Sequence, residues 1–399
     1  MSTHGKAIKI IVLSDIHPTM SSLPELGESH LKIDQSEETY NNPFAGLFTL
    51  VSKESIEADI ILCAGDLGTR AHPLTIKYTW DKLQELKEKA KAQALIVTPG
   101  NHDHDSRSKY LKYDPKGFLQ SLTPPFPYDF GDENSHFWAW NFDIIEHDNA
   151  RIITLNSSAY HGISDEYLYG RVTEITINKI KNKLASLPEK PINILLCHHH
   201  FHKNEEIKVE DYDAMEGASR LMAMLSEEAT GDWMLIHGHK HFPKIYYGQS
   251  SYGQSPIIFS AGSFSGDTNG ELGTVASNQV YLLEFNLEEI ENYGLVGKFK
   301  TWDWAHGRGW LKASDRSGIP HEGGFGCQAA PKLLLKELQE KLNGKSSYSR
   351  DEIVCLIPQL QFLTPMAVQK LKQISEENLA FEVFTSSGQI TEISKIKRT

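Results

Sequence analysis

Short apolar runs that end in histidine, aspartate or asparagine recur along this chain, and they restrict its fold more than any other feature. Residues 94–103, ALIVTPGNHD, are the clearest example. The apolar part predicts a buried strand, Pro-Gly ends it, and Asn101, His102 and Asp103 follow at once. Four further apolar runs end in the same way, with the polar residues Asp15 and His17, Asp66, His198, and His239 and His241.

The runs that precede these residues predict parallel strands joined by helices. Between the strands expected at 58–63 and 94–97, residues 79–93 place Trp80 and Leu83 at helical spacing, which predicts an amphipathic crossover helix. Such strand–helix–strand connections give parallel pairing, with helices on the faces of the sheet. The other elements expected here are strands at 7–13, 151–155, 192–197 and 232–236 and helices near 174–187 and 218–229.

Three other segments complete the first 304 residues. Residues 18–42 are polar and irregular, which predicts a long loop near the mouth of the site. Alternation in residues 135–142 predicts a β-hairpin. The overlapping segment at 124–140 either forms a substrate lid or packs as part of a hairpin. Strands at 256–260, 279–285 and 295–302 are expected to be antiparallel and to close a second sheet.

The composition changes after residue 304. We therefore expect a large domain, a Gly-rich linker or folded-back loop, and a small domain, at residues 1–304, 305–328 and 329–399. Residues 329–399 hold 10 Lys and Arg against 8 Asp and Glu, so they carry +2 while the whole chain carries −12. This small positive charge favours a protein partner or an oligomer contact over nucleic acid as the role of the small domain.

Residues 329–399 contain signals for three helices and a hairpin. A proline opens a helix at 331–342, Ser349 and Glu352 form a capping-box pattern, and Thr364 with the next proline begins a third helix. Apolar stretches flank Ser-Ser-Gly at 386–388, which predicts a hairpin. This order of elements is that of a winged-helix module.

The overall composition is that of an ordinary soluble globular protein, with 40% hydrophobic and 23% charged residues. The negative net charge argues against nonspecific attraction to nucleic acid or to an anionic membrane. The N-terminal apolar run contains a charge and predicts a strand rather than a secretory signal, and no window approaches the ~20 apolar residues of a spanning helix. A reducing, cytoplasmic location is expected because no CxxC pattern joins the four cysteines, Cys63, Cys197, Cys327 and Cys355.

The polar residues at the strand ends have the chemistry of a metal centre. In an open sheet covered by helices, ligands gather beyond the carboxyl ends of the strands, so these side chains are expected to converge there. Mixed carboxylate and imidazole ligands suit Mn²⁺, Fe or Zn²⁺ better than Ca²⁺. The set is larger than one ion needs and suits two ions that share a bridging carboxylate. Two ions ~3.5–4 Å apart are a known device for hydrolysing phosphoesters.

Taken in order, the motifs closely resemble those of the calcineurin-like metallophosphoesterases. They are D-x-H at 15–17, G-D at 65–66, G-N-H-D at 100–103, His198, and G-H-x-H at 238–241. The resemblance spans about residues 8–302. It implies an α/β (α+β) fold, namely a four-layer α/β/β/α sandwich, to which the small helical, winged-helix-like domain is added. It also implies an enzyme that hydrolyses phosphoric esters, closest in format to the cyclic-nucleotide phosphodiesterases.

The resemblance also implies a role for each motif residue. A hydroxide bridging two divalent ions would attack phosphorus, and manganese is favoured over iron or zinc. His102 would donate a hydrogen bond to the phosphoryl oxygen or protonate the leaving group as general acid, and Asp103 would orient His102 and hold it protonated. The implied ligands are Asp15, His17, Asp66 and His241 for the first metal, and Asp66, Asn101, His198 and His239 for the second.

Some positions have a second interpretation. His198, His199 and His200 compete for one ligand position, and we choose His198 because it comes first after the strand. His104 and Arg107 either contact the substrate phosphate or belong to a solvated loop. The residues expected only to support the site, to pack or to lie at the surface are Asn156, His200 and His202.

Three functions are compatible with these motifs. The leading prediction is a dinuclear metal-dependent phosphoesterase that acts on a phosphodiester such as a cyclic nucleotide. The second is a nuclease directed by residues 329–399, and the third is a non-catalytic scaffold with the same fold. The scaffold ranks last because every ligand position is retained.

Overall fold

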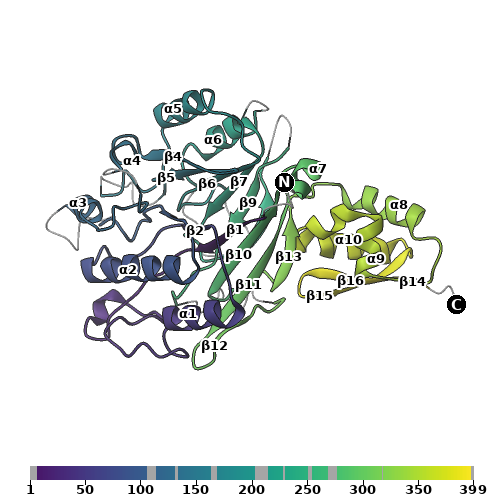
Figure 1. Ribbon diagram of the computed structural model, residues 1–399, viewed down its shortest axis with the longest axis horizontal. Helices are drawn as coiled ribbons and strands as arrows, with labels where there is room; N and C mark the ends of the chain where they lie inside the picture. Colours follow the sequence, from purple (N-terminus) through teal and green to yellow (C-terminus); the bar gives the residue numbers. More distant parts are fainter. Residues whose placement is uncertain are drawn as a thin grey trace, which may run out of the picture.

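The fold is described by a computed structural model, drawn in Figure 1. The structure describes residues 7–105, 114–130, 134–162, 169–202, 214–227, 230–249, 254–267, 276–316 and 318–396. Within these ranges the chain forms two mixed β-sheets that pack face to face, helices outside them, and a C-terminal part with its own small sheet.

The strands of the first sheet are β1 (Ala7–Leu13), β2 (Ile60–Cys63), β3 (Ala94–Val97), β10 (Gln279–Asn286), β11 (Gly297–Ala305), β12 (Gly309–Lys312) and β13 (Glu322–Phe325). Their order is β12-β11-β10-β1-β2-β3, and β13 also pairs with β11. β1 runs parallel to β2 and antiparallel to β10. The strands predicted for β1 and β3 have the bounds that the structure shows.

The strands of the second sheet are β4 (Phe142–His147), β5 (Ala150–Leu155), β6 (Ile192–Leu196), β7 (Trp233–His237), β8 (Lys244–Tyr247) and β9 (Ile257–Ser260). Their order is β4-β5-β6-β7-β9-β8, and the four central strands β5, β6, β7 and β9 run parallel. These four are buried along their whole length, as expected for parallel strands covered on both faces.

Helices cover the outer face of each sheet, which gives the α/β/β/α layer order (Figure 1). α1 (Pro43–Glu54) and α2 (Pro73–Lys89) pack on the first sheet, and both begin with a proline, which fits the first helical turn. α5 (Glu174–Leu184) and α6 (Ala218–Leu225) pack on the second. The sequence did not predict α1. No helix in the described ranges combines the length and apolar character needed to cross a membrane.

The shorter elements of this part are η1 (Pro24–Leu26), α3 (Pro115–Gln120), α4 (Ser135–Trp140) and α7 (Leu287–Tyr293). The prediction of a hairpin at 135–142 is wrong, because the first six residues form α4 and bury Phe137. The prediction that strands near 256–260, 279–285 and 295–302 share one sheet is also wrong. β9 lies parallel to β7 in the second sheet, whereas β10 and β11 join the first.

The predicted linker at 305–328 contains regular structure. β12 and β13 both lie in it, and both pair with β11, so this segment extends the first sheet. The glycines of β13 permit close packing: a Cβ on Gly323 would overlap the ring of Phe299, and one on Gly324 would overlap the backbone of Gln361. The glycines at these two positions therefore serve contact, and the pairing with β11 agrees with the folded-back interpretation of this segment. The division of the chain at 304 and 329 remains a prediction.

The C-terminal part consists of α8 (Pro331–Lys341), β14 (Ser347–Ser349), α9 (Arg350–Leu356), η5 (Pro358–Phe362), α10 (Pro365–Glu377), β15 (Phe381–Ser386) and β16 (Gln389–Lys395). The capping box of Ser349 and Glu352 is formed as predicted. β14, β16 and β15 make an antiparallel sheet, in that order, so this part is not purely helical. The sequence did not predict β14.

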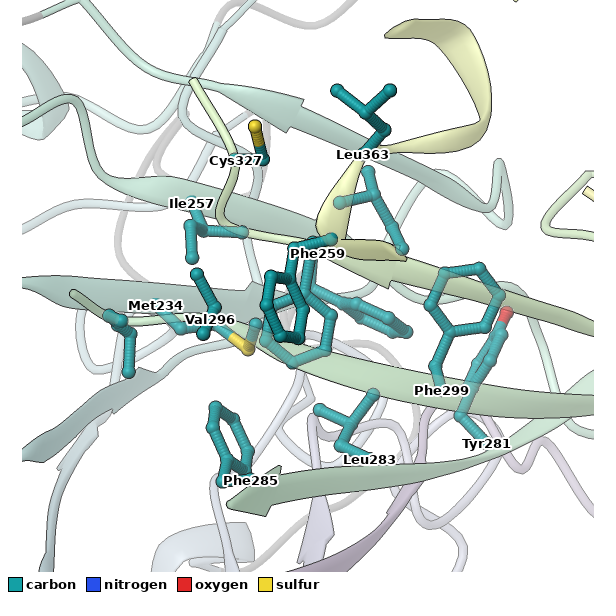
Figure 2. Packing of buried hydrophobic residues seen from close by; sticks show 14 of the residues in the cluster. Met234, Ile257, Phe259, Tyr281, Leu283, Phe285, Val296, Phe299, Cys327 and Leu363 are labelled. Atoms are coloured by element: carbon teal, nitrogen blue, oxygen red, sulfur yellow. The ribbon is translucent and has the colours of Figure 1, made fainter. Parts of the chain in front are cut away.

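One apolar core joins the two sheets and the C-terminal part. Figure 2 shows Met234 and Phe259 of the second sheet close to Leu283 of the first, and Cys327 and Leu363 beside them. All five belong to a single cluster of buried residues, which continues into α8, α9 and α10. The C-terminal part is therefore packed into the sandwich rather than tethered to it.

Candidate metal centre

The predicted site residues lie where the carboxyl ends of strands from both sheets meet. Backbone hydrogen bonds connect the loops there: Asp15 N donates to Gly65 O at 3.0 Å, and Gly238 N donates to His198 O at 3.1 Å. The structure thus brings together the loops that follow β1, β2, β6 and β7. Residues 101–103 join them, because His102 N donates to Asp66 Oδ1 at 2.7 Å.

Asp15, His17 and His241 form a first cluster of ligand atoms, all within 4.8 Å of one another. The Nε2 atoms of His17 and His241 are 3.1 Å apart, and His241 Nε2 is 3.3 Å from Asp15 Oδ1. A hydroxyl hydrogen bond from Ser14 to Asp15 Oδ2, at 2.5 Å, leaves Oδ1 to face the imidazoles. Ser14 was not identified from the sequence, although it directly precedes the D-x-H motif.

Asn101, His198 and His239 form a second cluster. His198 Nε2 is 2.9 Å from Asn101 Oδ1 and 3.2 Å from His239 Nδ1, and His239 Nδ1 is 3.1 Å from Asn101 Oδ1. The other ring nitrogen of His198 lies 2.7 Å from the carbonyl of Ala64 and donates to it. That bond orients the ring so that Nε2 is directed at the cluster, as is typical of a metal-ligating histidine.

Asp66 joins the two clusters. Its Oδ2 atom is 3.3 Å from His17 Nε2 and also 3.3 Å from His198 Nε2. Its Oδ1 atom accepts the amide of His102 and is thereby held to one side. A single carboxylate oxygen therefore faces both groups, which is the arrangement of a bridging ligand.

The donor atoms fit divalent cations. The Nε2 atoms of His17 and His241 lie 3.1 Å apart, and each is also 3.3 Å from a carboxylate oxygen. In their deprotonated form the two rings would present lone pairs to one shared point, where a cation would be coordinated by these nitrogens and oxygens together. Asp15, Asp66 and His198 are almost completely buried, so water does not easily take the place of a cation as the partner of these side chains. The nitrogen and oxygen donor set suits a first-row metal.

The backbone around the site is held in an unusual conformation. A positive φ is rare for residues other than glycine, and it is most often tolerated where function requires it. Glycines allow the loops to approach: a Cβ on Gly100 would overlap the carboxylate of Asp66, and one on Gly238 would overlap Ser14 and Asp15. The predicted ligands with a positive φ are Asp15 (52°), His17 (46°), Asp66 (54°), His239 (74°) and His241 (54°).

Burial and charge act in opposite directions on the pKa values in the site. Burial by itself raises the pKa of Asp15 and of Asp66, but neighbouring imidazoles hold the pKa of both carboxyls well below the usual range. Burial by itself lowers the pKa of His17 and of His198, but the charge of Asp66 raises both, and the pKa of His198 reaches about 9. The carboxylates and these two imidazoles therefore stabilise each other's charge.

Asp103 lies between the loops that follow β2 and β3. Its carboxylate accepts the backbone amides of Gly68 and Gly100, each at 2.8 Å, and within the described residues it makes no hydrogen bond to the ring of His102. Burial and the neighbouring imidazoles lower the pKa of His102 to about 4. The two backbone hydrogen bonds of Asp103 fasten the loops that follow β2 and β3 to each other.

The ring of His102 lies against the first cluster. Its centroid is 4.8 Å from that of His17, edge to face, and one of its nitrogens is within 4.8 Å of ligand atoms of His17 and Asp66. Unlike Asp15 and Asp66, it is partly exposed. It is therefore accessible at the surface of the cluster.

The other histidines of the region are mostly buried. His200 stacks on His239 with 5.7 Å between ring centroids, so it supports the second cluster rather than lying at the surface. His104 is buried and its ring is hydrogen-bonded to the side chain of Asn156, which excludes the solvated-loop interpretation. His199 is held by Ser157, a residue that was not identified from the sequence. Arg107 lies outside the described residues.

The family of the chain follows from comparison with known proteins. A family model named calcineurin-like phosphoesterase matches residues 8–248, and the chain belongs to this family of phosphoesterases. Families of this type typically bind two divalent metals, and the buried Asp and His clusters are consistent with a dinuclear site.

Two solved structures are similar to parts of this chain. Purple acid phosphatase PPD1 from seeds of yellow lupin (Lupinus luteus) has 12% identity over 77% of this chain and 53% of its own, with a TM-score of 0.46. Phosphopantetheinyl Hydrolase (PptH) from Mycobacterium tuberculosis has 12% identity over 64% of this chain and 90% of its own, with a TM-score of 0.32. The chain thus spans about half the length of the phosphatase. No curated protein matches the chain.

Proposed function

We propose that the protein is a dinuclear metal-dependent phosphodiesterase. The observation that carries the proposal is Asp66 Oδ2, which lies 3.3 Å from an imidazole nitrogen of each cluster. Manganese is the favoured metal, with iron and zinc as the other candidates. The ligands would be Asp15, His17, Asp66 and His241 for the first ion, and Asp66, Asn101, His198 and His239 for the second.

The residues around the ions have separate roles in this proposal. When bound, the two ions would lower the pKa of water and neutralise charge on the phosphoryl group. His102 lies at the accessible side of the cluster and is proposed to donate a hydrogen bond to the phosphoryl oxygen or, as general acid, to protonate the leaving group. Asp103 would act indirectly, because it holds the loops that carry Asp66 and His102.

Hydrolysis of bis-p-nitrophenyl phosphate and of p-nitrophenyl phosphate, each with Mn²⁺, tests the proposal. We expect metal-dependent turnover that chelation abolishes, and faster turnover of the diester than of the monoester. Folded protein that hydrolyses neither ester with Mn²⁺ present would rule out the proposed activity. Faster turnover of the monoester would make the protein a phosphatase instead. A panel of cyclic nucleotides then tests the proposed substrate class.

The C-terminal part supports a phosphodiesterase acting on a small substrate better than a nuclease. Its element order, with three helices and strands β14, β16 and β15 in one sheet, favours a winged-helix-like module. However, the turn between β15 and β16 is packed on the first sheet, where Glu322 N donates to Ser387 O at 3.2 Å. Because this turn is occupied, we favour a protein or oligomer contact over nucleic acid for residues 329–399.

A cytoplasmic location is also proposed. All four cysteines are unpaired, and two of them, Cys63 and Cys197, lie buried in or directly after strands. Unpaired thiols are the usual state in a reducing compartment.

A further inference from the structure

Ser157 makes three hydrogen-bonding contacts through its hydroxyl oxygen. His198 N and His199 N donate to Oγ at 3.3 and 3.2 Å, and His199 Nδ1 lies 2.9 Å from it. Ser157 is completely buried, so no water competes for these contacts. The hydroxyl therefore binds the backbone of the loop after β6 and one ring of that loop at once.

This count of contacts fixes the tautomer of His199. A hydroxyl has two acceptor lone pairs and one proton, and the two amides occupy both lone pairs. The remaining contact can only be made by the hydroxyl proton, which is donated to Nδ1 of His199. Nδ1 is then an acceptor without a proton, and the proton of the neutral ring sits on Nε2.

The Nε2–H of His199 has no partner within the described part of the chain. The side chain is 1% exposed, and its Nε2 atom makes no hydrogen bond there. Gly170 lies against Cβ, Cγ and Nδ1, so the Nε2 side of the ring faces away from Gly170 and Ser157. The ring centroid of His199 is only 4.5 Å from that of His239, a member of the second cluster.

A buried donor without a partner is costly, so its presence in the metal centre calls for an acceptor that arrives with the ligand. We propose that His199 is a further catalytic residue, and that its Nε2–H donates a hydrogen bond to a phosphoryl oxygen of the substrate. Ser157 is the positioning residue that fixes the tautomer needed for this. The inference rests on the proposed function and adds to it a second hydrogen-bond donor, next to His239 of the second cluster.

Variants of the two residues separate this role from a structural one. His199→Phe keeps a ring but removes the donor, whereas His199→Gln can place an N–H near the position of Nε2. Ser157→Ala frees the tautomer. Ser158→Ala is the matched control, because Ser158 is equally buried but its hydroxyl donates to Pro99 O, at 3.5 Å.

The expected results differ among the variants. With saturating Mn²⁺ and bis-p-nitrophenyl phosphate, His199→Phe is expected to lose about 100-fold in kcat, as for loss of one preorganised donor, and Ser157→Ala about tenfold. His199→Gln and Ser158→Ala should stay within a few-fold of the wild type. All folded variants should retain the metal content of the wild type. Inorganic phosphate should bind His199→Phe at least tenfold more weakly by calorimetry.

The proposal is overturned if His199→Phe retains the wild-type kcat, if His199→Gln is as inactive as His199→Phe, or if Ser157→Ala behaves as Ser158→Ala does. The last comparison decides the matter if His199→Phe does not fold. ¹⁵N NMR of the metal-free protein tests the tautomer without any activity: a protonated Nε2 supports the proposal, and a protonated Nδ1 overturns it. If the wild type hydrolyses no ester, the proposed function fails. The NMR experiment still determines the tautomer of His199 in that case.

Discussion

Three of the predicted metal ligands are held by neighbours that leave one atom of each directed at the cluster. His198 donates Nδ1–H to Ala64 O and leaves Nε2, and Asp66 accepts His102 N with Oδ1 and leaves Oδ2. Asp15 accepts the hydroxyl of Ser14 and leaves Oδ1 for His241. Such supporting bonds orient ligands before any ion arrives, which lowers the cost of binding it.

Replacing the bridging carboxylate is expected to abolish activity. The Asp66→Asn variant keeps the shape of the side chain but removes the charge that faces both clusters. We expect its metal-dependent hydrolysis of bis-p-nitrophenyl phosphate to fall more than about 100-fold. Asp81→Asn is the control, because this carboxylate forms an exposed ion pair with Lys77 on α2 and should have no effect. Activity of Asp66→Asn equal to that of the control would refute the assignment.

The stability of the metal-free protein is expected to fall in mild alkali. The pKa of His198 is about 9 in the folded state against an ordinary 6.5. The protonated ring therefore makes its full contribution to the free energy of unfolding below about pH 6.5. This contribution is lost as the pH rises through about 9. Urea unfolding should show a decrease on the order of 3 kcal/mol across this range, and His198→Asn should flatten the profile. Wild-type stability that is constant or rises between these pH values would contradict the expectation.

The sequence predicted which residues meet but not every contact they make. Asp15, Asp66 and His198 were identifiable because a polar residue directly after a buried apolar run is conspicuous. The bonds of Asp103 to Gly68 and Gly100 were not, because they depend on how two loops from different strands cross. The same holds for Ser157, which follows β5 but holds residues that follow β6.

Helices and strands were predicted best where the hydrophobic pattern in the sequence was long and regular. β1 and β3 are uniform apolar runs and were predicted to the residue. Helix α4 has only six residues, SHFWAW, and its alternation resembles that of a strand. β9, β10 and β11 were predicted as strands, but the choice of sheet is made by partners distant in sequence, such as Ile10 opposite Leu283.

The turn between β15 and β16 anchors the C-terminal part, and one glycine makes this possible. Gly388 has φ +84°, and a Cβ there would overlap the side chain of Pro320 and lie 2.6 Å from Glu322 O. We expect Gly388→Ala to lower the free energy of unfolding by about 3 kcal/mol, from backbone strain and overlap together.

Gly307→Ala is the matched control for this turn. Gly307 has φ +76°, but no atom of another described residue, its two chain neighbours aside, lies within 4 Å of the position that a Cβ would take. Only the backbone strain of the alanine is therefore expected to lower the free energy of unfolding, by about 1 kcal/mol. Urea unfolding of both variants measures the difference. Equal losses for the two glycines would show that the contact with Pro320 contributes nothing to stability.

At the scale of the whole molecule, the sandwich and the C-terminal part share their core. Phe299 of β11 and Val296, which directly precedes that strand, belong to the same buried cluster as Leu363 and Leu371 of the C-terminal part (Figure 2 shows Val296, Phe299 and Leu363). Within the described residues, the C-terminal part has no hydrophobic cluster of its own that is separate from the cluster between the two sheets. The module therefore covers apolar surface that the sandwich would otherwise expose.

Removal of the C-terminal part is accordingly expected to damage the catalytic part. A chain ending at residue 328 would expose Val296, Phe299 and Phe325, and we expect it to aggregate or to unfold without cooperativity. Circular dichroism and size-exclusion chromatography of the truncated chain measure this. A soluble, cooperatively folded truncation with full metal-dependent activity would instead show that residues 329–399 are an independent addition.

Anomalous diffraction from crystals grown with Mn²⁺ would show whether two ions share Asp66. We expect two anomalous peaks per chain, about 3.5–4 Å apart, both in contact with Asp66. One peak should also contact His17 and His241, and the other His198 and His239. A single peak, or two peaks of which one does not contact Asp66, would contradict the account.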